Sequence, residues 1–214
     1  DFSNKTFKFG YGKFITINSK KVWAQRLSYV GELGFELYIE NKDAKEIYQL
    51  IIEEGKNHNL SHCGSHAMDI MRMESGFLHW GHDISPEENQ YQAGLNFAIS
   101  YKKETGFVGK ESLLKIKDQE QTRKFIMLSL KDSKPGYPLL LHEEPIYLKD
   151  EIIGRTTSGN YSFNFKKNLS FGYVTSNHTN EELSKMDLYI EVAKQKYPAK
   201  VEITPLKDKS SRFL

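Results

Sequence analysis

The stretch from Arg26 to Glu40, RLSYVGELGFELYIE, decides how the first part of the chain is interpreted. Its centre is too polar for a buried strand, and its two glycines, Gly31 and Gly34, disfavour a helix. The run from Phe35 to Ile39 then alternates between inward and outward positions, as a half-buried strand does. The sequence therefore predicts a glycine-bent segment that leads directly into a short strand.

Glu36, at the start of that strand, is a candidate ligand-binding carboxylate. If it points inward it needs hydrogen-bond donors, because burying an unpaired carboxylate is costly. A flat heterocycle with adjacent ring N–H and NH₂ donors, such as a pterin, matches its two oxygens. Tyr29 can stack on such a ring, and Gly31 lets a ligand approach the backbone. A plain turn with Glu32 and Glu36 in solvent is the simpler interpretation of these residues taken alone.

Along the rest of the chain, the kind of secondary structure that the sequence predicts changes once. The first part contains a hairpin over residues 14–27 and three helices, at 41–60, 67–76 and 109–120. From about Thr122, six short strand candidates follow one another without a helix between them, which favours an antiparallel barrel or sandwich. They cover residues 124–130, 144–148, 151–159, 169–174, 187–193 and 199–205. We predict an α+β domain over 1–118 and an all-β domain over 122–214.

Two further expectations concern the side chains of the second predicted helix and one turn between the predicted barrel strands. In the helix over residues 67–76, we expect Met68, Met71 and Met73 to point largely inward as core. Arg72 and Glu74 are expected to point outward, with one of them lining the cleft as the alternative. The segment TTSGNYSFNF is expected to form a turn between barrel strands, with Gly159 at the bend; a direct ligand role is the alternative.

Trp80 opens the segment HWGHDISPEENQYQAGLNFAI, which brings several polar side chains together around Gly81. The adjacent His82 and Asp83 lack a second ligand pair at useful spacing, so a zinc site is not favoured. No Ser or Cys lies in a nucleophile motif. We expect His82 and Asp83 to hold the loop by hydrogen bonds. Trp80 is a candidate wall of a ligand cavity, with simple packing as the alternative.

Composition limits the class of protein. The chain has 214 residues, 38% hydrophobic, and its 30 basic and 28 acidic residues leave a net charge of +2. This balance argues against a nucleic-acid binder. Cys63 is the only cysteine, which fits a reducing, cytoplasmic compartment. No apolar run is long enough for a membrane span. The first residues, DFSNKTFKFG, lack the features of a secretory signal and do not start with Met, as expected for a fragment.

Four segments carry a family resemblance: RLSYVGELGFELYI, AMDIMRMESGFLHWGHDISPEENQYQAGLNFAI, GFVGKESLL and GRTTSGNYSFNFKKNLSFGYV. In this order they resemble the glycine-cleavage T-protein (aminomethyltransferase) family, in particular the tetrahydrofolate-binding C-terminal region of dimethylglycine and sarcosine dehydrogenases. The resemblance covers nearly the whole chain. It implies a partial cloverleaf that lacks its N-terminal part, with a ferredoxin-like-type α/β domain followed by a β-barrel.

The resemblance also implies a function, namely transfer of a one-carbon unit from a methylated amine to tetrahydrofolate. Glu36 matches the carboxylate that holds the pterin, and Tyr29 matches a ring-contacting position. The implied partners are folate, a methylated amine and the N-terminal domains of a parent enzyme. FAD would bind only in that parent, because this chain lacks the dinucleotide-binding glycine fingerprint.

Three departures from the family pattern matter. The family's general-base aspartate has no counterpart here, Met68 stands where aminomethyltransferases carry a folate-contacting arginine, and PLKDKSSRFL offers no match for a C-terminal tyrosine. We therefore expect a piece of a flavin-linked demethylating enzyme that is inactive alone. A non-catalytic scaffold or regulatory module is the alternative. A tRNA-modification or iron–sulfur-repair relative is disfavoured, because Cys63 lies in SHCGSH rather than in a Lys-Gly-Cys-Tyr-type motif.

Overall fold

The computed structural model describes residues 1–208 and divides the chain into two compact units. The sheet unit contains residues 1–75 together with the segment that begins at Lys207, and the barrel unit contains residues 76–206. The C-terminal tail, where the resemblance finds no matching tyrosine, lies for the most part outside the described residues. The two units divide after Ser75. The domain boundary near residues 118–122 remains a prediction, based on the change from helix to strand signals in the sequence.

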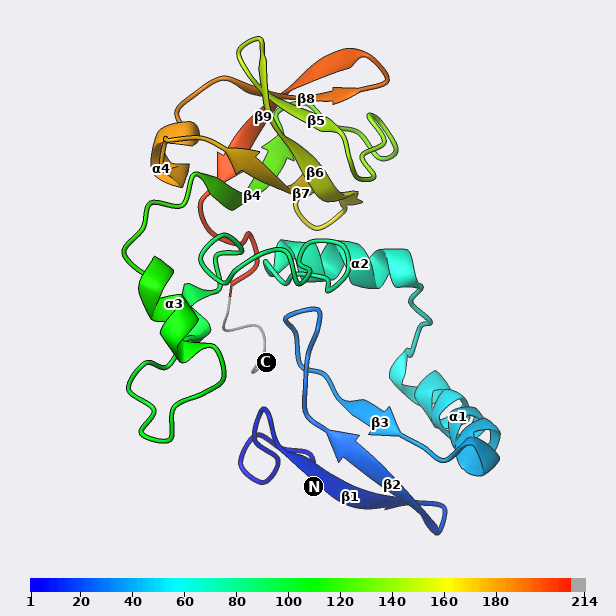
Figure 1. The fold of residues 1–214 in the computed structure, drawn as a ribbon. Helices are drawn as coiled ribbons and strands as arrows, with labels where there is room; N and C mark the ends of the chain where they lie inside the picture. Colours follow the sequence, from blue (N-terminus) through cyan, green and yellow to red (C-terminus); the bar gives the residue numbers. More distant parts are fainter. Residues whose placement is uncertain (209–214) are drawn as a thin grey trace. The chain divides into compact units, whose positions relative to one another are not determined.

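The sheet unit is built on a three-stranded antiparallel sheet in the order β1-β2-β3 (Figure 1). Strands β1 (Gly12–Ile17) and β2 (Lys20–Gln25) form the predicted hairpin. Its two turn residues, Asn18 and Ser19, both have positive φ, as tight hairpin turns require. Strand β3 (Glu36–Tyr38) pairs with the other edge of β2.

The helices of this unit follow the sheet in sequence. They are α1 (Asn41–Gly55), the short η1 (Lys56–His58) and α2 (Ser65–Glu74). Ion pairs from Lys20 to Asp43 and Glu46 tie α1 to the hairpin, and Ile47 of α1 is fully buried. Val22 and Ala24 of β2 are also fully buried, so the alternate side chains of β2 face the opposite side of the sheet.

The side chains of α2 correct two of our expectations. Arg72 and Glu74, expected in solvent, are each only 1% exposed, whereas Met68, expected inside, is 45% exposed. Met73 is buried as expected. The reason is that each buried charge has a partner: Arg72 donates from Nε and Nη2 to Asp69 Oδ1 at 2.9 and 2.7 Å, and Glu74 lies beside a lysine described below.

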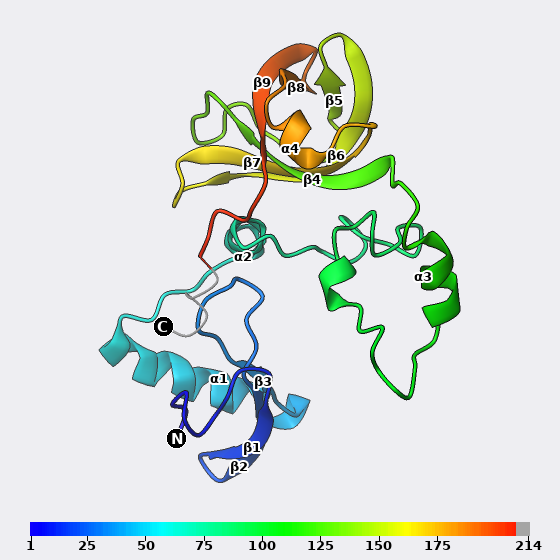
Figure 2. The ribbon, with the colours of Figure 1, turned by 90° about the vertical axis from the view of Figure 1, so that its left-hand side faces the viewer.

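The barrel unit contains a closed antiparallel barrel, which confirms the predicted β-barrel and the mixed α/β class. A segment with η2 (Asn96–Ala98) and α3 (Lys110–Ile116) precedes it. The strand order is β4-β7-β6-β5-β8-β9 (Figure 2). The bounds are β4 (Arg123–Leu130), β5 (Pro145–Leu148), β6 (Glu151–Ser162), β7 (Lys167–Thr175), β8 (Leu188–Val192) and β9 (Gln195–Glu202), with the short α4 (Asn180–Leu183) between β7 and β8.

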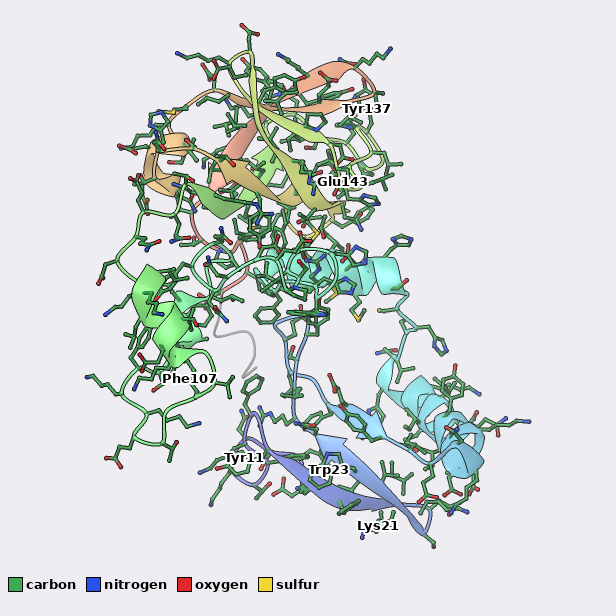
Figure 3. All side chains as sticks on the ribbon, viewed as in Figure 1. Tyr11, Lys21, Trp23, Phe107, Tyr137 and Glu143 are labelled. Atoms are coloured by element: carbon green, nitrogen blue, oxygen red, sulfur yellow. The ribbon has the colours of Figure 1, made fainter. Side chains whose placement is uncertain are left out.

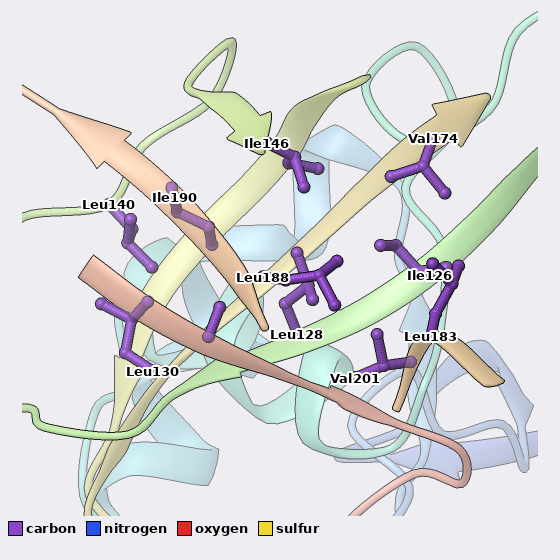
Figure 4. Packing of buried hydrophobic residues seen from close by; sticks show 11 residues of the cluster. Ile126, Leu128, Leu130, Leu140, Ile146, Val174, Leu183, Leu188, Ile190 and Val201 are labelled. Atoms are coloured by element: carbon purple, nitrogen blue, oxygen red, sulfur yellow. The ribbon is translucent and has the colours of Figure 1, made fainter. Parts of the chain in front are cut away.

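Apolar side chains from alternate positions fill the barrel interior (Figure 4). Gly159 lies inside β6 rather than at a bend, so the expected turn over TTSGNYSFNF is wrong for that residue. A Cβ at Gly159 would lie 2.5 Å from the Cβ of Leu140, which explains why the strand needs a glycine there. The core consists of Ile126, Leu128, Leu130, Leu140, Ile146, Val174, Leu183, Leu188, Ile190, Ala199 and Val201.

Candidate functional site

The segment between β2 and β3 is the glycine loop, residues 27–35. Gly31 has φ +72°, and a Cβ on it would lie 2.1 Å from the Oγ of Ser75. That Oγ donates a 2.9 Å hydrogen bond to the carbonyl of Val30, so the loop packs tightly on the end of α2. A Cβ at Gly34 would lie 2.8 Å from the carbonyl oxygen of Leu27. Both glycines are therefore required by close packing of the chain on itself.

A group of charged side chains, the Lys207 cluster (Lys207, Glu32 and Glu74), supports the glycine loop. Lys207 Nζ donates to Glu32 Oε1 at 2.6 Å and to the carbonyl of Val30 at 3.3 Å, and lies 3.7 Å from Glu74 Oε2. The backbone N–H of Lys207 donates to the carbonyl of Glu74 at 2.9 Å. The lysine side chain is only 11% exposed, and its ammonium lies beside one half-exposed carboxylate, Glu32, and one buried carboxylate, Glu74. The segment at residue 207 thereby fixes the conformation of the loop.

Glu36 lies on the open face of the sheet, the face opposite Val22 and Ala24, and it is exposed. The hydroxyl of Tyr38, two residues along the same strand, donates to Glu36 Oε2 at 2.8 Å. That hydrogen bond and the carboxylate charge raise the pKa of Tyr38. No other residue among 1–208 donates to the carboxylate, so Oε1 is available to a ligand.

The open face carries a row of three aromatic side chains across the sheet. Phe14, Trp23 and Tyr38 are direct neighbours in the strand register, and the rings of Phe14 and Trp23 meet edge to face at a centroid distance of 5.0 Å. Trp23 and Lys21 extend from β2 (Figure 3), and Lys21 Nζ lies 3.9 Å from the Phe14 ring centroid. Gly12 has no Cβ because the Trp23 indole would collide with it at 2.2 Å. The face therefore offers flat surfaces beside a carboxylate.

The four residues predicted from sequence are divided between the two units. Tyr29, half-buried in the glycine loop, Gly31 and Glu36 belong to the sheet unit. Trp80 belongs to the barrel unit, where it is 65% exposed and forms an isolated β-bridge with Ile84. Three of the four candidates thus lie in the glycine loop or directly after it.

The loop that follows Trp80 is organised by Asp83, as expected. This buried carboxylate accepts hydrogen bonds from the backbone N–H of His79 at 2.9 Å and from the hydroxyls of Thr157 and Ser158 at 2.5 and 2.8 Å. His82 donates from its backbone N–H to the carbonyl of His79 at 3.1 Å, and its ring packs against the His79 ring in a tilted arrangement with centroids 4.4 Å apart. Across the described residues, 1–208, no three acidic, histidine or cysteine side chains group as they would around a metal ion.

Sequence reasoning missed two residues of the site. Lys207 had no local signal, because its partner Glu32 is 175 residues away in the chain. Tyr38 could have been found, because residues i and i+2 of a strand share a face and the Glu-x-Tyr spacing is visible in the quoted stretch.

Within residues 1–208, every helix is too short or too polar to traverse a lipid bilayer.

Comparison with known proteins gives consistent matches along the chain. Residues 1–103 match the model of the GCVT N-terminal domain, and residues 123–208 match that of the glycine cleavage T-protein C-terminal barrel domain. Dimethylglycine dehydrogenase from Rattus norvegicus mitochondria is 34% identical over 210 residues, which are 96% of this chain and 23% of that protein. An aminomethyltransferase from Listeria welshimeri is 33% identical over 205 residues, which are 96% of this chain and 53% of that protein.

The fold has a counterpart among solved structures. Aminomethyltransferase T of the glycine cleavage system from Bartonella henselae superimposes with a TM-score of 0.79 at 20% identity, over 96% of this chain and 54% of that one. The chain thus spans about half the length of the aminomethyltransferases that it matches and about a quarter of the dehydrogenases.

Proposed function

The chain belongs to the glycine cleavage T-protein family, and from this premise we propose that it is the tetrahydrofolate-binding portion of a one-carbon-transferring enzyme. We further propose that the parent is a flavin-dependent dehydrogenase of dimethylglycine or sarcosine that delivers a methylene group to tetrahydrofolate. Names of relatives support the second step, since they include dimethylglycine and sarcosine dehydrogenases.

A single observation carries the folate proposal. Glu36 presents a carboxylate on an open sheet face, with Oε2 engaged by Tyr38 and Oε1 without a donor among residues 1–208. Such a group fits the adjacent N–H and NH₂ donors at the edge of a pterin, and the aromatic row beside it fits a flat ring. The carboxylate acceptor and the aromatic surface beside it therefore suit the group that the family relationship implies.

In this proposal the residues of the chain bind and orient. Glu36 would hold the pterin edge, and the glycine loop, fixed by the Lys207 cluster, would set the position from which β3 presents that carboxylate. Tetrahydrofolate supplies the nitrogen nucleophile that accepts the one-carbon unit. Positioning of this kind accelerates a reaction by making it effectively intramolecular. We assign no proton transfer to Glu36, and flavin chemistry would belong to other parts of the parent protein.

The test uses the natural polypeptide that contains these residues. Calorimetric titration with folinate is expected to show that Glu36→Ala weakens binding about 10- to 100-fold, because a charge-assisted hydrogen bond is lost. Glu40→Gln is the matched control, since Glu40 is also an exposed glutamate beside β3 and its side chain pairs, among residues 1–208, only with Lys42. Unchanged folinate affinity in Glu36→Ala would refute the assignment. Formation of 5,10-methylene-tetrahydrofolate from a methylated amine separates an enzyme from a non-catalytic folate-binding or scaffold module.

A further inference from the structure

Tyr38 is hydrogen-bonded to Glu36, the proposed folate-binding carboxylate. Its hydroxyl lies 2.8 Å from Glu36 Oε2, and this is the only hydrogen bond to that carboxylate from residues 1–208. Both side chains are exposed, and Tyr38 is 55% exposed. An exposed tyrosine needs no protein partner, because water satisfies its hydroxyl. The hydrogen bond therefore has a consequence for Glu36 rather than for the stability of the fold.

That consequence is a restriction of rotamers. A glutamate side chain in solvent samples many conformations, and a ligand that binds it must fix one of them. The Tyr38 hydroxyl holds Oε2 before any ligand arrives and leaves Oε1 facing solvent. The carboxylate plane is thereby set in advance, so part of the ordering that a ligand would require is already present in the free protein.

Tyr38 is itself kept in place by its position in the sheet. It is the direct register partner of Trp23, which in turn neighbours Phe14, so the tyrosine ring ends the aromatic row. The β3 backbone then places Glu36 and Tyr38 on one face, two residues apart. Glu36 neighbours Gln25 in the next row, and Gln25 neighbours Gly12, over which the Trp23 indole lies.

We propose that Tyr38 is a positioning residue that orients Glu36 for a ligand with paired N–H donors on a flat ring, and that its ring extends the surface on which such a ligand lies. This inference rests on the proposed function, because it assigns a role toward the same carboxylate. Tyr38 acts through Glu36 and through ring contact; it takes no part in proton transfer. The ligand class that this arrangement selects is a heterocycle whose edge carries a ring N–H next to an exocyclic amine.

The experiment measures folinate affinity of the natural polypeptide containing Tyr38→Phe, which keeps the ring and removes the hydroxyl. We expect a loss of about 3- to 10-fold, because the carboxylate is no longer pre-oriented. Tyr48→Phe is the matched control, since Tyr48 is equally exposed at 55% and its hydroxyl has no hydrogen-bond partner among the described residues. Unfolding midpoints of both variants are expected to equal that of the unmodified protein.

Two further measurements separate orientation from general disruption. Tyr38→Phe is expected not to change the affinity for a folinate analogue without the exocyclic amine, because that ligand makes less use of the oriented carboxylate. In the Glu36→Ala background, Tyr38→Phe is expected to add no further loss for folinate. Equal loss for both ligands, or an additive loss in the double variant, overturns the proposal. If Glu36→Ala weakens folinate binding and Tyr38→Phe does not, this inference fails while the proposed function stands; if neither variant weakens it, the proposed function fails.

Discussion

Replacement of Lys207 by methionine is expected to destabilise the sheet unit by about 3 kcal/mol. The side chain is 11% exposed and its ammonium lies between Glu32 and Glu74. Methionine retains most of the apolar stem but leaves the Glu74 carboxylate, 1% exposed, without that cation. Removing one partner of a buried pair costs roughly 3–5 kcal/mol, and a half-exposed pair such as that with Glu32 adds at most about 1 kcal/mol.

The lower end of the range applies because of two distances. Glu74 Oε2 is 3.7 Å from Lys207 Nζ, longer than a hydrogen bond, whereas the 2.6 Å contact is to the more exposed Glu32. A variant that also carries Glu74→Gln is expected to recover part of the loss, because the buried carboxylate that has lost the Lys207 cation is then neutral.

Urea unfolding followed by tryptophan fluorescence measures this effect. The chain has two tryptophans, so a Trp80→Phe background leaves Trp23 as a reporter inside the sheet unit. Lys42→Met is the matched control in the same unit, since Lys42 is 73% exposed and pairs with Glu40, which is 69% exposed; it is expected to change stability by less than about 0.5 kcal/mol. A loss below about 1 kcal/mol for Lys207→Met, or an equal loss for the control, would refute the reasoning.

Two other predictions concern one glycine and one carboxylate. Gly31→Ala should lower the thermal midpoint, with a loss of about 1–3 kcal/mol in the free energy of unfolding, since its φ is +72° and the new Cβ would collide with the Ser75 hydroxyl oxygen. Gly64→Ala is the control, because a Cβ there meets open space, and it should lose far less stability. Equal losses in the two variants would contradict the packing argument. For Glu88, burial alone raises the pKa, but hydrogen bonds from Ser85 and Arg123 outweigh it and the net pKa is lowered. Its contribution to stability is therefore present above the unfolded pKa, about 4.3, and is lost as pH falls through the lower folded value. Urea unfolding from pH 6 to pH 3 should show a shallower decline in Glu88→Gln, and identical pH profiles would contradict this.

Local sequence was informative wherever the physical signal is local. Each of the six predicted barrel strands overlaps a strand of the closed barrel, because alternating apolar side chains and intervening turn residues mark strands directly. The hairpin over residues 14–27 and the strand at Glu36–Tyr38 were visible for the same reason. Closure of the barrel was beyond these patterns, since an open sandwich has the same alternation.

The charged residues of α2 show where local patterns stop. Arg72 and Glu74 were placed in solvent because burial of a charge is costly without a partner. For Arg72 the partner, Asp69, lies one turn away on the same helix, so that signal was in the sequence and was overlooked. For Glu74 a partner is Lys207, and nothing in the sequence pattern of either segment indicates that the two side chains meet.

The sequence by itself determined the order of the elements, the two glycines of the loop and the presence of a carboxylate at the start of β3, because backbone conformation and side-chain alternation depend on neighbouring residues. Only the tertiary structure decided that Gly31 serves packing against Ser75, that Lys207 supports the loop, and that Glu36 faces outward with Tyr38 bonded to it. These outcomes depend on which distant segments meet, and the free energy of a buried charge or a close contact is defined only once both partners are in place.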